Sequence, residues 1–130
     1  MVEQVIVNIE RTQHEIQVST LDPAIGIAIW DIPRHEFVPE NLSPFAYFDI
    51  LLPVGYAQNT SQPFLNALIT QLAAVDKNNR VFETKSGSGY HAAILLRLAT
   101  QQLEEMGCTN IEVRHANGFY GWKKRGPADA

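Results

Sequence analysis

The chain has 130 residues, of which 45% are hydrophobic and 18% charged, and its formal net charge is −4. These values are those of a globular protein and predict a single domain over residues 1–130. The acidic balance provides no electrostatic footprint for nucleic acid or an anionic membrane, and the one basic cluster, residues 123–125, is interpreted as a solvated tail. The single cysteine, Cys108, excludes an intrachain disulfide and a cysteine-built zinc site.

The sequence contains neither a membrane span nor a targeting segment. No apolar run approaches the roughly 20 residues that a bilayer requires, and the N-terminus lacks a signal-peptide pattern. The four histidines show no metal-ligand spacing, so no metal site is expected. We therefore expect a soluble, cytoplasmic protein.

The N-terminal third contains two predicted helices. Residues 2–10 are weakly amphipathic and favour a short helix. Asp22 and Pro23 are a typical cap and first-turn pair, and the apolar run that follows reaches Trp30 and stops at Pro33.

The middle of the chain predicts a short strand and a further helix. Residues 49–60 alternate loosely and indicate a short strand that leads into a turn at Gly55. Ser61 is a typical N-cap, Pro63 suits the first turn, and residues 64–75 carry an apolar stripe of helical period.

The last third reads as strand, loop, helix and strand. "RVFET" (80–84) is the strongest strand signal; a helix is expected from Tyr90 to Met106, closed by Gly107 in a left-handed conformation. "NIEVRH" (110–115) alternates as a second strand, and the remainder reads as loop. This order predicts a right-handed parallel crossover, which is the unit of α/β folds. The loop 85–89 and the turn 116–118 would then lie side by side beyond the carboxyl ends of the strands.

The glycine loop by itself does not identify a ligand. A phosphate-binding loop carries its lysine after the glycines, whereas Lys85 precedes Gly87, and the dinucleotide fingerprint needs three spaced glycines, whereas only Gly87 and Gly89 are present. A tight strand-to-helix turn explains "GSG" as well as a ligand does.

Four segments together are more specific. "IPRHEFVPE", "LLPVGYAQNTSQPF", "VFETKSGSGYHAAILLRLA" and "IEVRHANGFYGW" follow one another in this order. The chain resembles the protein-L-isoaspartate O-methyltransferases from about Asp22 to Asp129. The resemblance implies a partial Rossmann-like class I methyltransferase fold of the α/β class with a reduced, mostly parallel sheet. It also implies a helical, substrate-side segment (1–78) and a glycine-loop crossover unit (79–130).

The resemblance further implies methyl transfer from S-adenosylmethionine to the isoaspartyl carboxylates of damaged proteins or peptides. Ser61 matches the family's active-site serine. The positions that match cofactor-binding residues are Asn59, Thr60, Glu83, Gly87, Gly89, Asn117 and Gly118.

The chain departs from the family pattern in ways that predict weak or absent cofactor binding. Lys85 replaces a glycine and adds positive charge beside a sulfonium, and Asn117 replaces an aspartate. The expected second strand, with its ribose-binding acid, is missing, because residues 90–107 read as one helix. Glu104 and Glu105 have a suitable offset but read as a solvated helix face. A reduced sheet would leave an edge open to self-association. A non-catalytic interaction module and an inactive fragment are the alternatives to a working enzyme.

Overall fold

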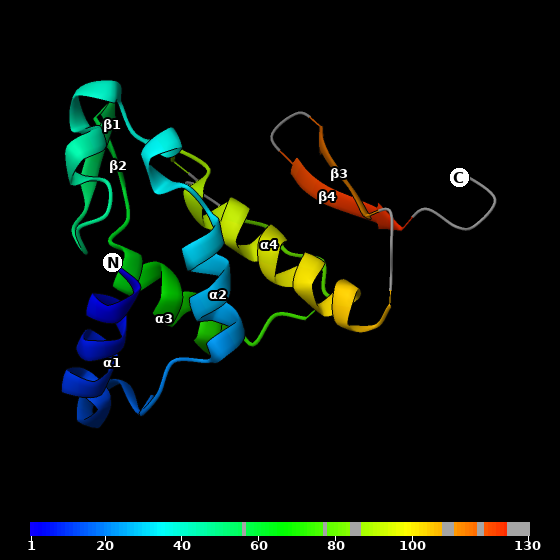
Figure 1. The fold of residues 1–130 in the computed structure, drawn as a ribbon, viewed down its shortest axis with the longest axis horizontal. Helices are drawn as coiled ribbons and strands as arrows, with labels where there is room; N and C mark the ends of the chain where they lie inside the picture. Colours follow the sequence, from blue (N-terminus) through cyan, green and yellow to red (C-terminus); the bar gives the residue numbers. More distant parts are fainter. Residues whose placement is uncertain (56, 77, 84–86, 108–110, 117–118, 125–130) are drawn as a thin grey trace.

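The computed structural model describes residues 1–55, 57–76, 78–83, 87–107, 111–116 and 119–124, the last two ranges as backbone only. Four helices and two small sheets make up the described chain (Figure 1). The helices are α1 (Val2–Ile16), α2 (Pro23–Asp31), α3 (Pro63–Ala73) and α4 (Tyr90–Glu105). Two 3₁₀ turns, η1 (Arg34–Phe37) and η2 (Glu40–Phe45), follow α2. The strands are β1 (Leu52–Gly55), β2 (Gln58–Thr60), β3 (Ile111–Ala116) and β4 (Phe119–Lys124).

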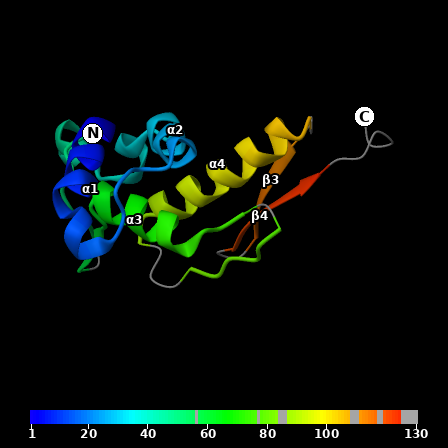
Figure 2. The ribbon, with the colours of Figure 1, turned by 90° about the horizontal axis from the view of Figure 1, so that it is seen from below.

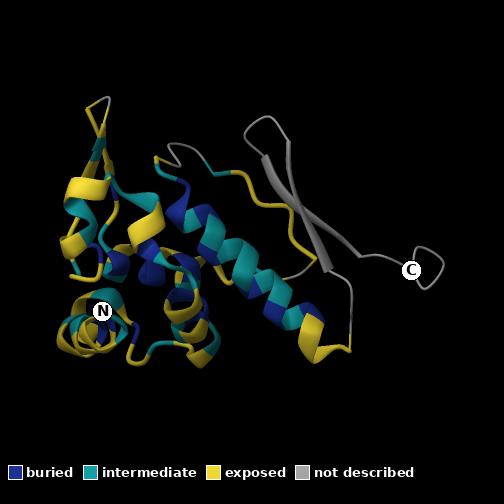
Figure 3. Cartoon of the chain, turned by 45° about the horizontal axis from the view of Figure 1, so that its top comes forward, coloured by how far each residue is buried: buried dark blue, intermediate teal, exposed yellow. Residues whose placement is uncertain are grey.

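The hydrophobic core lies among the helices, because each helix turns its apolar stripe toward the others. In Figure 3 the buried faces of α2, α3 and α4 point toward one another. Fully buried side chains come from every helix, with α1 and α2 supplying most of the aliphatic volume. They are Val5, Ile9, Ala28, Ile29, Ala67 and Ile94. The β3–β4 hairpin lies beyond α4, away from α1, in both Figure 1 and Figure 2.

The predictions for α2 and α4 are confirmed. Asp22 is the N-cap of α2, and its carboxylate accepts a hydrogen bond from the backbone N–H of Ala24 at 2.8 Å. α4 runs without interruption to Glu105, and Gly107 follows with φ 78°, as expected for a left-handed helix end. The N-terminal helix α1 is longer than the predicted 2–10, because Ile16 at its far end also packs against the core that Val5 and Ile9 enter.

The prediction that Ser61 caps α3 is wrong. The N-cap position belongs to Gln62, whose side chain makes no capping bond. The acceptor comes instead from a residue distant in sequence: Asp49 Oδ1 accepts the backbone N–H of Phe64 at 2.7 Å. Asp49 Oδ2 also accepts a hydrogen bond from Gln62 Nε2 at 3.1 Å. A tertiary contact therefore replaces a local cap at the start of α3. The Ser61 side chain makes no capping bond and is exposed.

The α/β class and the partial character of the fold are confirmed, but the mostly parallel sheet is wrong for the described residues. Both sheets are two-stranded and antiparallel, β1 with β2 and β3 with β4. Residues 80–83 form no strand, although this stretch has the strongest strand signal in the sequence. A strand needs a hydrogen-bonding neighbour, and the expected neighbour β3 instead pairs with β4, in a region predicted to be loop.

The C-terminal end of α3 gives the first testable prediction. Ala74 ends the helix with φ 47° and ψ 43°, a left-handed conformation that costs a residue with a Cβ about 1 kcal/mol. Ala74→Gly is therefore expected to raise the free energy of unfolding in urea by about 0.5–1 kcal/mol. The matched control is Ala73→Gly at the last residue of the helix, whose backbone is still helical, and this substitution is expected to lower the free energy of unfolding by up to a similar amount. Destabilisation by both substitutions would contradict the prediction.

Candidate functional site

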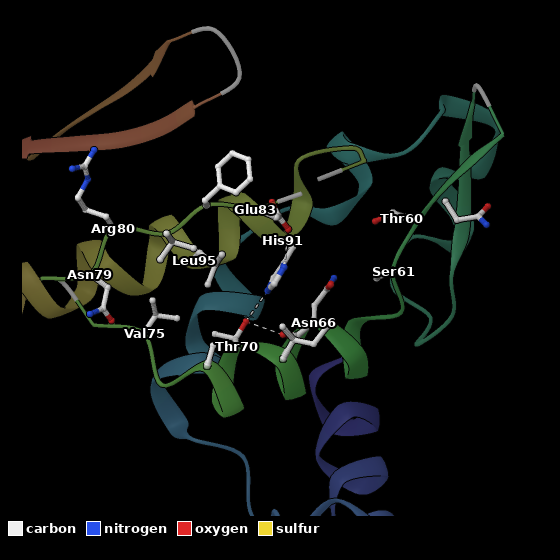
Figure 4. A pocket seen from close by; sticks show the side chains of 15 residues that line it. Thr60, Ser61, Asn66, Thr70, Val75, Asn79, Arg80, Glu83, His91 and Leu95 are labelled. Atoms are coloured by element: carbon white, nitrogen blue, oxygen red, sulfur yellow. Dashed lines mark hydrogen bonds and ion pairs between the residues drawn. The ribbon is translucent and has the colours of Figure 1, made fainter. Parts of the chain in front are cut away.

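A pocket of about 830 Å³ lies between α3, α4 and the extended segment that precedes the glycine loop (Figure 4). One end of this pocket is polar and the other is largely apolar. The polar end is formed by Asn59, Thr60, Ser61, Asn66, Thr70, Glu83 and His91. The largely apolar end is formed by Ile69, Ala73, Val75, Val81, Phe82 and Leu95, with two polar residues, Asn79 and Arg80, beside them (Figure 4). Such a two-sided cavity suits a ligand with a charged part and an apolar part.

The structure brings four of the sequence-predicted site residues to this pocket. Asn59 and Thr60 end strand β2, Ser61 follows them, and Glu83 arrives from the segment before the glycine loop. The β1–β2 hairpin and the N-terminus of α3 hold the Ser61 turn from its two ends. Residues 22 positions apart in sequence, Ser61 and Glu83, thus line one cavity.

The remaining candidates lie beside the pocket or outside the described residues. Gly87 and Gly89 have φ values of 57° and 84°, a left-handed backbone that glycine adopts without a Cβ penalty. They form the turn between two pocket residues, Glu83 and His91. Asn117 and Gly118 lie outside the described residues, as does Lys85. The expected approach of the 116–118 turn to the glycine loop is therefore untested.

A hydrogen-bond chain crosses the polar end of the pocket. His91 Nδ1 lies 2.8 Å from Glu83 Oε1, and His91 Nε2 lies 3.0 Å from the hydroxyl of Thr70 (Figure 4). The Thr70 hydroxyl itself donates to the backbone carbonyl of Asn66 at 2.7 Å. The side chains of His91 and Glu83 are 16% and 20% exposed, so this contact is shielded from most solvent. Sequence reasoning identified Glu83 but had no signal for Thr70, which lies on another helix.

His91 links Glu83 on one side of the pocket to Thr70 on the other. Its Nδ1 lies within hydrogen-bond distance of the Glu83 carboxylate and its Nε2 within hydrogen-bond distance of the Thr70 hydroxyl, so the ring holds both side chains in place. The second carboxylate oxygen, Oε2, is buried without a hydrogen-bond partner among the described residues. It is available to a donor on a ligand.

The glutamates at the end of α4 do not reach the pocket. Glu104 accepts a hydrogen bond from Arg97 Nη1 at 3.2 Å on the helix surface, where Arg97 also pairs with Asp31 at 2.9 Å. Glu105 is exposed. This agrees with the interpretation of a solvated face. Within the described chain, no cluster of three metal-ligating side chains occurs. No helix in the part that the structure covers could span a bilayer.

Comparison with known proteins assigns the chain to a family. The model of the protein-L-isoaspartate(D-aspartate) O-methyltransferase family matches residues 3–102. A protein-L-isoaspartate O-methyltransferase 2 from Polaromonas sp. is 35% identical over the whole of this chain, which covers 69% of that relative. A namesake from Nitrosococcus oceani is 37% identical over 91% of this chain and 61% of its own length. A protein-L-isoaspartate O-methyltransferase from Synechococcus sp. is 38% identical over 84% of this chain and 51% of its own length. The chain belongs to the protein-L-isoaspartate O-methyltransferase family.

The chain is shorter than these relatives, both in length and within the aligned region. It spans between about half and two thirds of their length. The alignment with the Polaromonas protein covers 146 positions, 16 more than the 130 residues of this chain. At least 16 positions in the aligned part of that relative thus have no counterpart here. The sequence predicts an omission of this kind where α4 continues without a break.

Proposed function

We propose that the chain is a carboxyl methyltransferase that takes a methyl group from S-adenosylmethionine and transfers it to isoaspartyl carboxylates in damaged proteins or peptides. The observation that carries this proposal is the convergence of the Ser61 turn and Glu83 on one two-sided pocket. Family membership supports the reaction class.

The residues present fit the cofactor, because the pocket offers it a buried carboxylate oxygen and an apolar wall. S-adenosylmethionine, when bound, supplies the electrophilic methyl group. Within the described chain, Asn59, Thr60, Glu83, Gly87 and Gly89 are the residues proposed to hold it. Asn117 and Gly118 are proposed to complete its site.

The contribution of the protein is orientation. An isoaspartyl carboxylate is already an anion and a nucleophile, so no strong general base is needed. The Ser61 hydroxyl is exposed at the polar end of the pocket and is proposed to hold the substrate carboxylate by a hydrogen bond. Fixing the reacting groups in this way is a large source of rate enhancement, since a misplacement of about 1 Å can cost 10²-fold.

Cofactor affinity is expected to be low. Lys85 adds a positive charge next to the glycine turn, and the sequence lacks the acid that binds the ribose in related folds. The first test is a calorimetric titration of the purified, folded chain with S-adenosylhomocysteine. Saturable binding would support the proposal and lead to a methyl-transfer assay. Absence of heat at high ligand concentration would favour a non-catalytic relative.

Ser61→Ala tests the substrate side of the proposal. Loss of the hydroxyl is expected to lower kcat/KM for an isoaspartyl peptide by about tenfold, the value of one hydrogen bond to a charged group. The matched control is Ser19→Ala, an exposed serine outside the pocket, which is expected to have no effect. A peptide with normal aspartate reports the background. Equal activity of both variants would contradict the assigned role of Ser61.

Two organisational features complete the proposal. Segment 1–78 is proposed to form the substrate side of the domain and segment 79–130 the cofactor side. Self-association through an open edge of the small sheets remains a prediction, and sedimentation of the purified chain would test it.

A further inference from the structure

The motif "PRHEF" contains a fully buried arginine, Arg34, at the start of η1. Its guanidinium donates to four backbone carbonyls. Arg34 Nη1 reaches the carbonyl oxygens of Ala46 at 2.8 Å and Phe48 at 3.0 Å. Arg34 Nη2 reaches those of Ile50 at 2.8 Å and Ser61 at 3.2 Å. One side chain therefore fastens the loop 46–50 and the Ser61 turn together.

The same guanidinium also contacts the beginning of α4. The Arg34 Cζ lies 5.5 Å from the centroid of the Tyr90 ring, within the range of a cation–π contact. Phe37, three residues later in η1, packs edge-on against that ring at 5.7 Å. Tyr90 is 1% exposed and directly follows the glycine turn. Two residues of η1 thus contact the Tyr90 ring at the start of α4: Arg34 lies over its face, and Phe37 packs against it edge to face.

Burial of the charged Arg34 guanidinium costs free energy, so its hydrogen bonds indicate what the residue does. Burial lowers the pKa of the Arg34 guanidinium, and the nearby Tyr90 and Asp49 oppose that effect. None of its hydrogen bonds that the structure describes goes to a carboxylate; all four go to main-chain oxygens. A planar fork with several fixed donors can serve four carbonyls at once, whereas an ammonium group cannot. This position therefore requires the planar, multi-donor shape of arginine and not only its positive charge.

We propose that Arg34 is the positioning residue of the site: it fixes the Ser61 turn relative to the glycine turn at the start of α4. Arg34 is not among the residues that line the pocket, so it acts through the Ser61 backbone and the Tyr90 ring. The inference builds on the proposed function, because Ser61 is taken to orient the substrate carboxylate. The first experiment below, amide hydrogen exchange, tests the role of Arg34 without relying on methyl transfer.

The test compares Arg34→Lys with Leu98→Ala by amide hydrogen exchange. Leu98 lies in the core of α4, 6% exposed and outside the pocket lining, so its truncation lowers stability without touching the turn. At matched global stability, Arg34→Lys is expected to speed exchange of the amides in residues 46–62 by about tenfold relative to Leu98→Ala. Equal exchange of this segment in the two variants would overturn the inference.

The second readout is methyl transfer to an isoaspartyl peptide. Arg34→Lys is expected to lower kcat by about 10²-fold through misplacement of Ser61, and Leu98→Ala to leave it within about twofold while the protein is folded. If the wild-type chain transfers no methyl group, the proposed function is wrong. The hydrogen-exchange result then still decides whether Arg34 positions the Ser61 turn. An active wild type with unchanged kcat in Arg34→Lys overturns the inference alone.

A milder variant keeps the test usable should Arg34→Lys fail to fold. Tyr90→Leu keeps an apolar side chain at this position but removes the ring that faces the guanidinium and packs against Phe37. It is expected to speed exchange in residues 46–62 by about threefold relative to Leu98→Ala, in keeping with one cation–π contact. Tyr90→Phe, which retains the ring, is expected to exchange like the wild type. Equal exchange in the leucine and phenylalanine variants would count against the coupling to α4.

Discussion

Replacement of Asp49 by alanine is expected to lower the free energy of unfolding by about 3 kcal/mol, because one carboxylate serves three donors in two parts of the chain. It accepts the backbone N–H of Phe64 at 2.7 Å and so caps α3. It also accepts from the side chains of Gln62 and of Asn8 on α1. Its loss would leave these donors without a partner and loosen the start of α3 next to Ser61.

Urea unfolding monitored by circular dichroism measures this effect. The matched control is Asp31→Ala, another carboxylate in a long-range contact, which pairs with Arg97 on the surface with a side chain 35% exposed. Such pairs contribute less than about 1 kcal/mol, so the control is expected to change stability little. Similar losses in the two variants would show that Asp49 does not act as a cap.

Replacement of His91 by alanine is expected to weaken binding of S-adenosylhomocysteine by about tenfold, because it removes the side chain that holds Glu83 in the pocket. The His91 ring joins the Glu83 carboxylate to the Thr70 hydroxyl, and its loss leaves both groups without this partner. Glu83 is proposed to hold the cofactor, so a less fixed carboxylate is expected to bind it less tightly. A hydrogen bond to a charged group contributes about 1.5 kcal/mol, which corresponds to about tenfold in Kd.

Calorimetric titrations of the folded wild type and His91→Ala with S-adenosylhomocysteine measure this change. His14→Ala, on the outer surface of α1, is the matched control and is expected to bind like the wild type. Equal affinity of His91→Ala and the wild type would mean that the cofactor does not depend on the His91–Glu83 contact.

Several local features could be predicted from the sequence because short-range chemistry determines them. The Asp22–Pro23 start of α2, the uninterrupted helix from Tyr90 and the left-handed Gly107 all follow from caps, periodicity and backbone preference. The family could likewise be identified from its motifs in order, and the match over residues 3–102 confirms it. Asn59, Thr60 and Ser61 could be placed together because they are consecutive in the sequence.

Only the tertiary structure decided how these elements combine. Residues 80–83 have strand composition but form no strand, because strand formation depends on a neighbour that is distant in sequence. The cap of α3 comes from Asp49 rather than from Ser61, and the partner of His91 Nε2 is Thr70 on another helix. Arg34 was read only as part of a motif, since nothing local shows that an arginine will be buried. Long-range hydrogen bonds to main-chain carbonyls leave no pattern in the sequence, and the proposed positioning of the site depends on these bonds.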